Sequence, residues 1–177
     1  MNAIAYTHKR SALIDLAGII SCAGLMVLAS YVKIPLFFTP VPLTLQTFVL
    51  FLSILYLRKK AVFSQLLYVV WGVSGLSVFS HGGAGLAYFA GPTGGYILGF
   101  LFTALIVPYL LPSRRSFGRI FGVFFLANIC IVYGMGILWL WGVHHFSLPA
   151  AVAAGVLPFF LADTVKIALV SSFPRNS

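Results

Sequence analysis

The sequence predicts an all-α integral membrane protein with six transmembrane helices, forming a single domain over residues 1–177. Three observations predict this class. The chain is 61% hydrophobic and only 7% charged, whereas about a quarter of the residues of a soluble domain are charged. Its apolar residues fall into six runs separated by polar, Pro-rich or Gly-rich turns. Its basic residues lie in short clusters between these runs, as they do in the cytoplasmic loops of membrane proteins.

The first predicted span covers residues 12–31. It is about twenty residues long and lacks a small-x-small cleavage site near its end, which favours a transmembrane helix over a signal peptide. Asp15 lies in the first turn, where an acidic side chain suits the helix N-terminus. Ala17, Gly18 and Ser21 belong to stripes of small residues that permit close contact with another helix. Ordinary packing within the chain is the alternative interpretation of these stripes.

A Pro-rich turn over residues 34–42 follows, which no helix can cross intact. The second predicted span, residues 43–57, is short for a bilayer, so part of the preceding turn is expected at membrane depth beside protein. This span carries Thr44 and Gln46 in its first turn. The Gln46 amide can bond either a ligand or the neighbouring backbone. The basic cluster at residues 58–60 closes the span.

The third predicted span covers residues 61–79, and two Gly-rich segments, residues 80–85 and 91–96, follow it. Glycine permits positive φ and close approach of the backbone. The second segment opens the fourth predicted span, residues 93–111, and the free N–H groups of such a helix N-terminus favour an anion. The Lys-Ser/Thr pair of a phosphate-binding P-loop is absent. The alternative is a simple turn whose helix packs on a neighbour through Gly95-x-x-x-Gly99.

The fifth predicted span covers residues 120–143 and holds the polar residue Asn128. It ends in Trp139 and Trp141, which are typical of the membrane interface. The adjacent histidines 144–145 point apart on any regular backbone and make a poor metal site. The sequence therefore predicts no metal site.

The sixth predicted span, residues 150–173, carries Asp163 and Lys166, which face the same side of a helix. Each charge at membrane depth costs roughly 2.5–3.5 kcal/mol on insertion scales. The pair is either a structural ion pair inside the helix bundle or a ligand site. Pro158 lacks an N–H group, which frees the Ala154 carbonyl for another partner.

The distribution of Lys and Arg predicts the orientation of the chain. Six spans place nine basic residues on one side and Lys33 alone on the other, so both termini are expected in the cytoplasm. The nine are Lys9, Arg10, Arg58, Lys59, Lys60, Arg114, Arg115, Arg119 and Arg175. Because these charges form no single patch, the net charge of +9 does not indicate nucleic-acid binding. The uncharged outer loops are candidates for the mouth of a pocket that has Asp163 about half-way down.

Several of these segments together resemble a known family, the BioY family, the biotin-specific substrate-capture (S) components of energy-coupling factor transporters. The resemblance covers nearly the whole chain in order. It rests on Ile34-Pro35-Leu36, Pro40-Val41-Pro42-Leu43-Thr44-Leu45-Gln46-Thr47, Gly91-Pro92-Thr93-Gly94-Gly95-Tyr96 and Pro158-Phe159 with Asp163-x-x-Lys166. The chain departs from the family pattern at Ala162, where the family usually has glycine, and at Ser77, where proline is common. Its alanine-rich stripe on the first helix is partial.

The resemblance implies a six-helix multi-pass protein of the cytoplasmic (inner) membrane that takes up biotin, uses no cofactor and is not an enzyme. It implies a transmembrane coupling subunit and ATPase subunits as partners, in contact with Ala17, Gly18 and Ser21. The expected biotin-binding residues are Thr44, Gln46, Tyr68, Phe79, Gly82, Gly83, Gly94, Tyr96, Asn128, Asp163 and Lys166, with Trp71 as a further wall. An S component for another vitamin is the first alternative. An intramembrane enzyme is less favoured, because the sequence offers no second buried acid and no catalytic triad.

Overall fold

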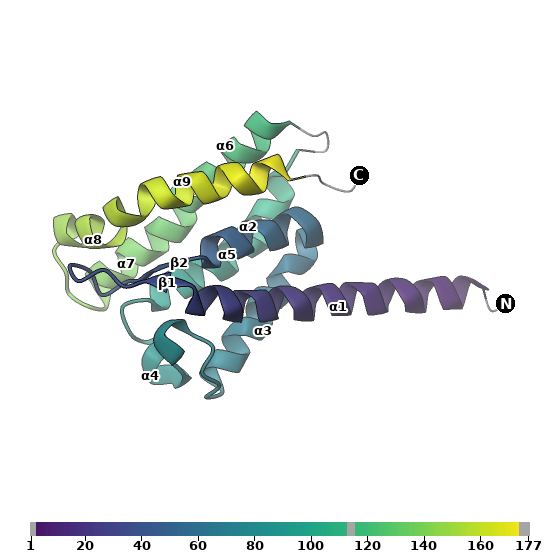
Figure 1. Ribbon diagram of the computed structural model, residues 1–177, viewed down its shortest axis with the longest axis horizontal. Helices are drawn as coiled ribbons and strands as arrows, with labels where there is room; N and C mark the ends of the chain where they lie inside the picture. The colour runs from purple at the N-terminus through teal and green to yellow at the C-terminus, as the bar shows by residue number, and fades with distance from the viewer. Residues whose placement is uncertain (1–2, 113–115, 174–177) are drawn as a thin grey trace.

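The computed structural model describes residues 3–112 and 116–173 and, for residues 3–11, the backbone alone. The described chain is a bundle of helices with one small hairpin (Figure 1), which confirms the predicted all-α class. The helices are α1 (Ala3–Tyr31), α2 (Gln46–Leu57), α3 (Ala61–Val73), α4 (Gly85–Phe89), α5 (Gly94–Leu110), α6 (Phe117–Ala127), α7 (Gly134–Gly142), α8 (Leu148–Gly155) and α9 (Leu157–Ser172). Shorter helical segments are η1 (Arg58–Lys60), η2 (Ser80–Gly82) and the π-helix η3 (Asn128–Tyr133).

Helix α1 packs on α2 and α3 with its C-terminal half, while its N-terminal half extends beyond the rest of the molecule (Figure 1). In the packed half, Ala23, Met26 and Ala29 are buried, whereas Leu13 and Leu16 in the other half are more than half exposed. An ion pair between Asp15 and Lys60 of η1 links the extended half to the α2–α3 turn. Asp15, the acidic residue at the start of the first predicted span, therefore pairs with the basic cluster at residues 58–60 of the same chain.

A two-stranded hairpin, β1 (Lys33–Ile34) and β2 (Leu43–Thr44), occupies the predicted Pro-rich turn. The strands are antiparallel with Lys33 opposite Thr44, and the Leu45 N–H joins them to the end of α1 through the Ala29 and Val32 carbonyls. Helix α2 consequently begins at Gln46, three residues later than the predicted range. The hairpin thereby places residues 41–47 next to the helices that follow.

Helix α3 ends at Val73, earlier than the predicted range of residues 61–79, because Gly75 adopts φ +102° and turns the chain. Phe79 then folds back into the bundle, where a Cβ on Gly72 would lie 2.0 Å from its ring. Its ring also lies against Tyr68 and Tyr88. This packing fixes the irregular segment that leads to α4.

Helix α5 lies close against η3 and α7 along a line of glycines. A Cβ on Gly95 would be 2.3 Å from the Trp139 Cβ, and one on Gly99 would be 3.0 Å from the Val132 Cα. The Gly95-x-x-x-Gly99 pair therefore serves helix packing, which was the alternative interpretation of this segment.

Helices α8 and α9 form one bent pair with an angle of 41° between them. The bend lies at Val156, two residues before Pro158, and Ser147 caps the start of α8 by accepting a bond from the Ala150 N–H. The Thr39 hydroxyl of the hairpin donates to the Ala154 carbonyl at 2.8 Å. The expected new partner for this carbonyl is thus confirmed, and it ties the hairpin to the bend.

By length and apolar composition, the segments Ala12–Tyr31 and Phe117–Gly142 can each cross a membrane, and the α8–α9 pair adds a third if taken as one span. Helix α5 is apolar but shorter, at 17 residues. Many large apolar side chains are exposed on the outside of the bundle, as expected for a membrane protein. The count of six spans stays a prediction. Of the basic residues used for orientation, Arg114, Arg115 and Arg175 lie outside the described residues.

Candidate functional site

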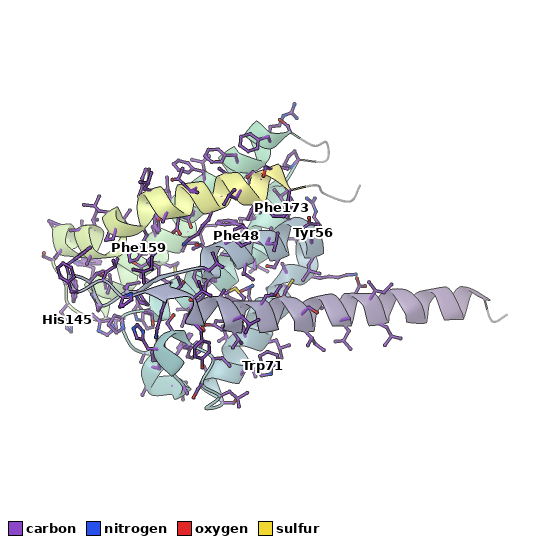
Figure 2. The ribbon with its side chains drawn as sticks, in the orientation of Figure 1. Phe48, Tyr56, Trp71, His145, Phe159 and Phe173 are labelled. Atoms are coloured by element: carbon purple, nitrogen blue, oxygen red, sulfur yellow. The ribbon has the colours of Figure 1, made fainter. Side chains whose placement is uncertain are left out.

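A cavity opens within the bundle, between the hairpin, α2, α3, the 80–93 segment, α5, η3 and α9. Its empty volume, counted with its opening to solvent, is about 540 Å³. Phe159 lies on the inner side of α9 near the N-terminal end of that helix (Figure 2). The cavity is lined by Val41, Pro42, Leu43, Thr44, Gln46, Thr47, Tyr68, Ser80, Tyr88, Thr93, Tyr96, Ile97, Phe100, Val132, Tyr133, Phe159, Asp163 and Lys166.

Asp163 is the centre of a hydrogen-bond network in the cavity wall and is only 4% exposed. Its Oδ1 accepts bonds from Lys166 Nζ and Thr47 Oγ1, each at 2.8 Å. Its Oδ2 accepts a bond from the Tyr133 hydroxyl at 2.9 Å. The buried carboxylate is thus neutralised and has donors on both oxygens, as buried charges require.

Lys166 is held by three acceptors. Besides Asp163, its ammonium donates to the Thr44 carbonyl at 2.5 Å and to Thr47 Oγ1 at 3.2 Å. The two charged residues project from one face of α9, and both line the cavity. The pair is therefore an ion pair and a part of the cavity wall at once.

A second polar group comes from the start of α2 and from α3. The Gln46 amide donates to the Tyr68 hydroxyl at 2.7 Å, while Thr44 Oγ1 donates to Gln46 Oε1 at 3.2 Å. The change from strand to helix at residues 44–46 directs the Thr44, Gln46 and Thr47 side chains into the same cavity. This local geometry explains why a short polar stretch supplies three lining residues.

The apolar wall depends on close packing around Tyr96 of α5. The Tyr96 hydroxyl donates to the Gly155 carbonyl at 2.7 Å. A Cβ on Gly136 would lie 2.3 Å from this ring and one on Gly155 would lie 2.4 Å from its hydroxyl. Glycine at both positions makes room for Tyr96, whose ring meets Phe159 edge to face at 6.4 Å.

Three hydroxyl groups form a further polar part of the lining. Tyr88 of α4 lines the cavity together with Ser80 and Thr93, and its ring stacks on Phe79 at 5.4 Å. All three hydroxyl-bearing residues come from the Gly-rich region between α3 and α5. The glycines there shape the backbone, and the neighbouring side chains face the cavity.

The structure brings six of the predicted binding residues into the cavity wall: Thr44, Gln46, Tyr68, Tyr96, Asp163 and Lys166. The other five lie outside it: Phe79, Gly82, Gly83, Gly94 and Asn128. Phe79 is fully buried behind Tyr68, with ring centroids 5.5 Å apart. A Cβ on Gly83 would meet the Tyr88 ring at 2.1 Å, and a Cβ on Gly94 would meet the Phe89 carbonyl oxygen at 1.9 Å.

Two further expectations differ from the observed positions. Trp71 lies at the edge of the molecule (Figure 2), where it lines a shallow apolar groove against α1. Gly18, expected on a partner face, packs on its own chain, since a Cβ there would be 2.9 Å from Leu57 Cδ2. Ala17 and Ser21 of the same helix are exposed.

Sequence reasoning missed Thr47 and Tyr133, the two hydroxyl donors to Asp163, and the aromatic residues Tyr88, Phe100 and Phe159. A signal for the two donors exists in the sequence, because each is a polar side chain within a long apolar run. A buried carboxylate needs several donors. That requirement points to such residues as its partners.

The arrangement is suited to binding. It offers one carboxylate, one ammonium, several hydroxyl groups and an apolar wall. Among the described residues, no group of three His, Cys, Asp or Glu side chains could hold a metal ion. The cavity therefore matches a small molecule that has hydrogen-bond donors, an acceptor and an apolar body.

Comparisons with known proteins agree with this geometry. The model of the BioY family matches residues 5–176. The biotin transporter BioY of Thermotoga maritima is 34% identical over 84% of this chain and 86% of its own length. The probable biotin transporter BioY of Pyrococcus horikoshii is 36% identical over 73% of this chain and 75% of its own. The crystal structure of the S-component for biotin from an ECF-type ABC transporter matches with a TM-score of 0.83 and 25% identity, covering 92% of this chain and 89% of that one.

Proposed function

Because this chain belongs to the BioY family, we propose that it captures biotin as the S component of an energy-coupling factor (ECF) transporter. It is a membrane transport protein and not an enzyme. We place it in the cytoplasmic membrane as a multi-pass protein, with six spans and both termini in the cytoplasm. The observation that carries the proposal is the buried Asp163–Lys166 pair in the wall of a cavity of about 540 Å³.

Biotin has the chemistry that this cavity can bind. Its ureido ring carries two N–H donors and one carbonyl acceptor, its bicyclic body is apolar, and its tail ends in a carboxylate. Charge-assisted hydrogen bonds are the strong ones, so Asp163 is the proposed acceptor for the ureido N–H groups. Lys166 is the proposed donor to the ureido carbonyl or to the carboxylate.

The remaining lining residues have proposed roles as well. Tyr96, Phe100 and Phe159 would pack against the apolar bicyclic body. The hydroxyl groups of Ser80, Tyr88 and Thr93 are the proposed donors for the end of the ligand that Lys166 does not bind. Thr47 would exchange its bond to Asp163 for one to the ligand, because a hydroxyl can both donate and accept.

The partners proposed for transport are a transmembrane coupling subunit and ATPase subunits. The exposed residues Ala17 and Ser21, one helical turn apart on α1, form a small-residue surface suited to close helix contact. Gly18 is left out of this surface because it faces Leu57 of the same chain.

Calorimetry on the detergent-purified protein tests the proposed ligand. We expect saturable binding of biotin without turnover, and no binding of lipoate or thiamin at the same concentrations. The variant Thr164→Val is a matched control beside Asp163, because the Thr164 hydroxyl donates to the Phe160 carbonyl of its own helix. Its biotin affinity should be unchanged. Binding of thiamin in place of biotin would indicate an S component for another vitamin.

A further inference from the structure

Lys33 carries a charge that no other part of the described chain neutralises. Its side chain is partly exposed, and the Lys33 ammonium makes no hydrogen bond, ion pair or ring contact among the described residues. Every other lysine with a described side chain has such a partner. The partners are Asp15 for Lys60, the Tyr109 ring for Lys59 and Asp163 for Lys166. The Lys33 ammonium is therefore free to act on a molecule outside the chain.

The hairpin places Lys33 directly beside the cavity. Lys33 in β1 is paired with Thr44 in β2, and Thr44 lines the cavity. The Cα atoms of two residues paired in this way are about 5 Å apart. The ammonium sits on a flexible four-carbon chain, so its charge stays within roughly one Debye length, about 10 Å at 0.1 M salt, of the cavity wall. Lys33 is not itself among the lining residues.

No acidic residue opposes this charge. The chain has only two, and both are paired elsewhere. Asp15 pairs with a lysine of η1, toward the end of the bundle opposite the hairpin (Figure 1). Asp163 lies in the cavity wall, but Lys166 neutralises it at 2.8 Å. The uncompensated charge beside the cavity is therefore that of Lys33, and apolar walls of low dielectric concentrate the field of such a charge.

We propose that Lys33 attracts the carboxylate of an approaching anionic ligand and so speeds its entry into the cavity. Attraction of this kind acts on the association rate and is screened by salt. Contacts inside the cavity set the dissociation rate instead. This inference rests on the proposed function and extends it to the step before the ligand is bound.

The consequence is a preference for the charge of the ligand that does not depend on its ring. An anionic ligand enters faster than a neutral analogue of the same shape, and the advantage disappears as salt is added. The Debye length falls from about 30 Å at 0.01 M to about 3 Å at 1 M salt. The association rate of an anionic ligand should therefore fall over this range, whereas the rate of the neutral analogue should not.

Stopped-flow fluorescence tests the proposal on the full chain, purified in an uncharged detergent, with biotin as the ligand. In about 0.01 M salt, Lys33→Gln should slow association roughly twofold and Lys33→Glu roughly fourfold, as expected for a unit charge about 10 Å away in water. Lys33→Arg should keep the native rate. In about 1 M salt all four proteins should associate at the same rate. Their dissociation rates should be equal at both salt concentrations.

The conditions exclude two other sources of a changed rate. A buffer at about pH 8 keeps histidine largely uncharged, so the histidines near the hairpin end add little to the field. The melting temperatures of the variants should equal that of the unaltered protein, because Lys33 has no partner to lose within the described chain. The rates therefore compare proteins with the same fold.

Lys59→Gln is the matched control for net charge. It removes the same charge from the opposite end of the bundle, where the Lys59 ammonium lies 4.4 Å from the centre of the Tyr109 ring. Biotin association should stay at the native rate in this variant. Equal slowing by Lys59→Gln and Lys33→Gln would make the total charge of the protein responsible and contradict the proposal.

Biotin amide, in which a carboxamide replaces the carboxylate, is the control for the ligand. Its association rate should be the same for the unaltered protein and Lys33→Gln at every salt concentration. Slower entry of the amide into Lys33→Gln would assign the effect to the shape of the hairpin and overturn the proposal.

The remaining outcomes separate this inference from the proposed function. A faster dissociation of biotin from Lys33→Gln, with unchanged association, would make Lys33 a contact of the bound ligand and overturn its role in entry. Absence of biotin binding by the unaltered protein would remove the proposed function and this inference with it. Native biotin binding with an association rate that does not depend on residue 33 would remove the inference alone.

Discussion

At the scale of single residues, the site is organised by the cost of placing a charge inside a membrane protein. Asp163 and Lys166 offset each other at 2.8 Å, and hydroxyl groups and a backbone carbonyl satisfy their remaining bonds. Removing one partner of a buried pair leaves an uncompensated charge and costs several kcal/mol, about 3–5. The same pair can therefore stabilise the fold and bind a ligand, and these two roles are separable by experiment.

The first prediction separates them with three variants. Asp163→Asn and Lys166→Ala should each lower the melting temperature of the ligand-free protein, because each leaves the other charge buried. The double variant Asp163→Asn/Lys166→Met should recover stability, yet its biotin affinity should remain at least roughly tenfold weaker. Melting and calorimetry on the same samples check both outcomes. A stable double variant with native affinity would remove the pair from the binding site.

At the scale of elements, close helix contacts hold the cavity wall in place. Tyr96 reaches the α8–α9 bend only because Gly136 and Gly155 leave space for its ring and hydroxyl. The bend itself is joined to the hairpin by the bond from Thr39 to Ala154. The cavity is therefore formed jointly by the hairpin, α5, η3 and α9, and a change in one contact should alter the others.

The second prediction concerns Gly136→Ala. The added methyl group would lie 2.3 Å from the Tyr96 ring, so the ring must move and release its bond to the Gly155 carbonyl. We expect lower thermal stability, by about 1–3 kcal/mol as for overpacked cores, together with weaker biotin binding.

Gly122→Ala is the matched control for this substitution. It lies in the same long helix, and a Cβ there would have nothing within 4 Å. It should leave affinity unchanged and raise stability slightly, because alanine favours helix. Equal effects of the two substitutions would show that the contact with Tyr96 does not matter.

At the scale of the whole molecule, the two ends of the bundle differ in charge. The start of α1, the α2–α3 turn and the end of α9 share one end, while the hairpin and the α7–α8 connection lie at the other (Figure 1). Arg58, Lys59 and Lys60 are at the first end. The second end carries uncharged segments apart from Lys33 and the histidines.

The third prediction is the orientation in the membrane. Reporter fusions after Lys60 and Arg119 should report a cytoplasmic location, and fusions near Gly83 and His145 an external one, because basic loops stay inside. Reporter activity in whole cells measures this directly. A cytoplasmic signal at Gly83 would overturn both the orientation and the external mouth of the cavity.

The fourth prediction concerns the proposed partners. Ala17→Leu should weaken co-purification with the transmembrane coupling subunit and reduce biotin uptake, because a larger side chain separates closely packed helices. It should leave biotin binding to the isolated chain unchanged, since Ala17 lies far outside the cavity lining.

Ala12→Leu is the control, because Ala12 is exposed about 140° around the same helix. It should affect neither co-purification nor uptake. Undiminished uptake against a gradient in cells that lack all coupling subunits would contradict the proposed coupling.

The sequence by itself determined the class of the protein and identified the pair of charges, Asp163 and Lys166, whose burial costs the most free energy. Composition indicated a helical membrane protein, because too few charges are present for a soluble surface. The i, i+3 spacing placed Asp163 and Lys166 on one helix face. The missing N–H of Pro158 predicted a free Ala154 carbonyl, and the Thr39 hydroxyl bonds it. Each of these conclusions depends on chemistry that is local in the chain.

The tertiary structure alone decided which polar residues meet. The partners of Asp163, namely Thr47, Tyr133 and Lys166, come from three segments, and Thr47 is 116 residues from Asp163 in the chain. Three irregular features point side chains in directions that a regular helix would not give. They are the hairpin, the positive φ at Gly75 and the π-turn at residues 128–133. Asn128 therefore lies behind the cavity wall and Tyr133 in it. Packing between helices sets these directions. A helix that is apolar on all sides can turn any of its faces toward the bundle within a membrane, so its sequence does not specify which side chains point inward.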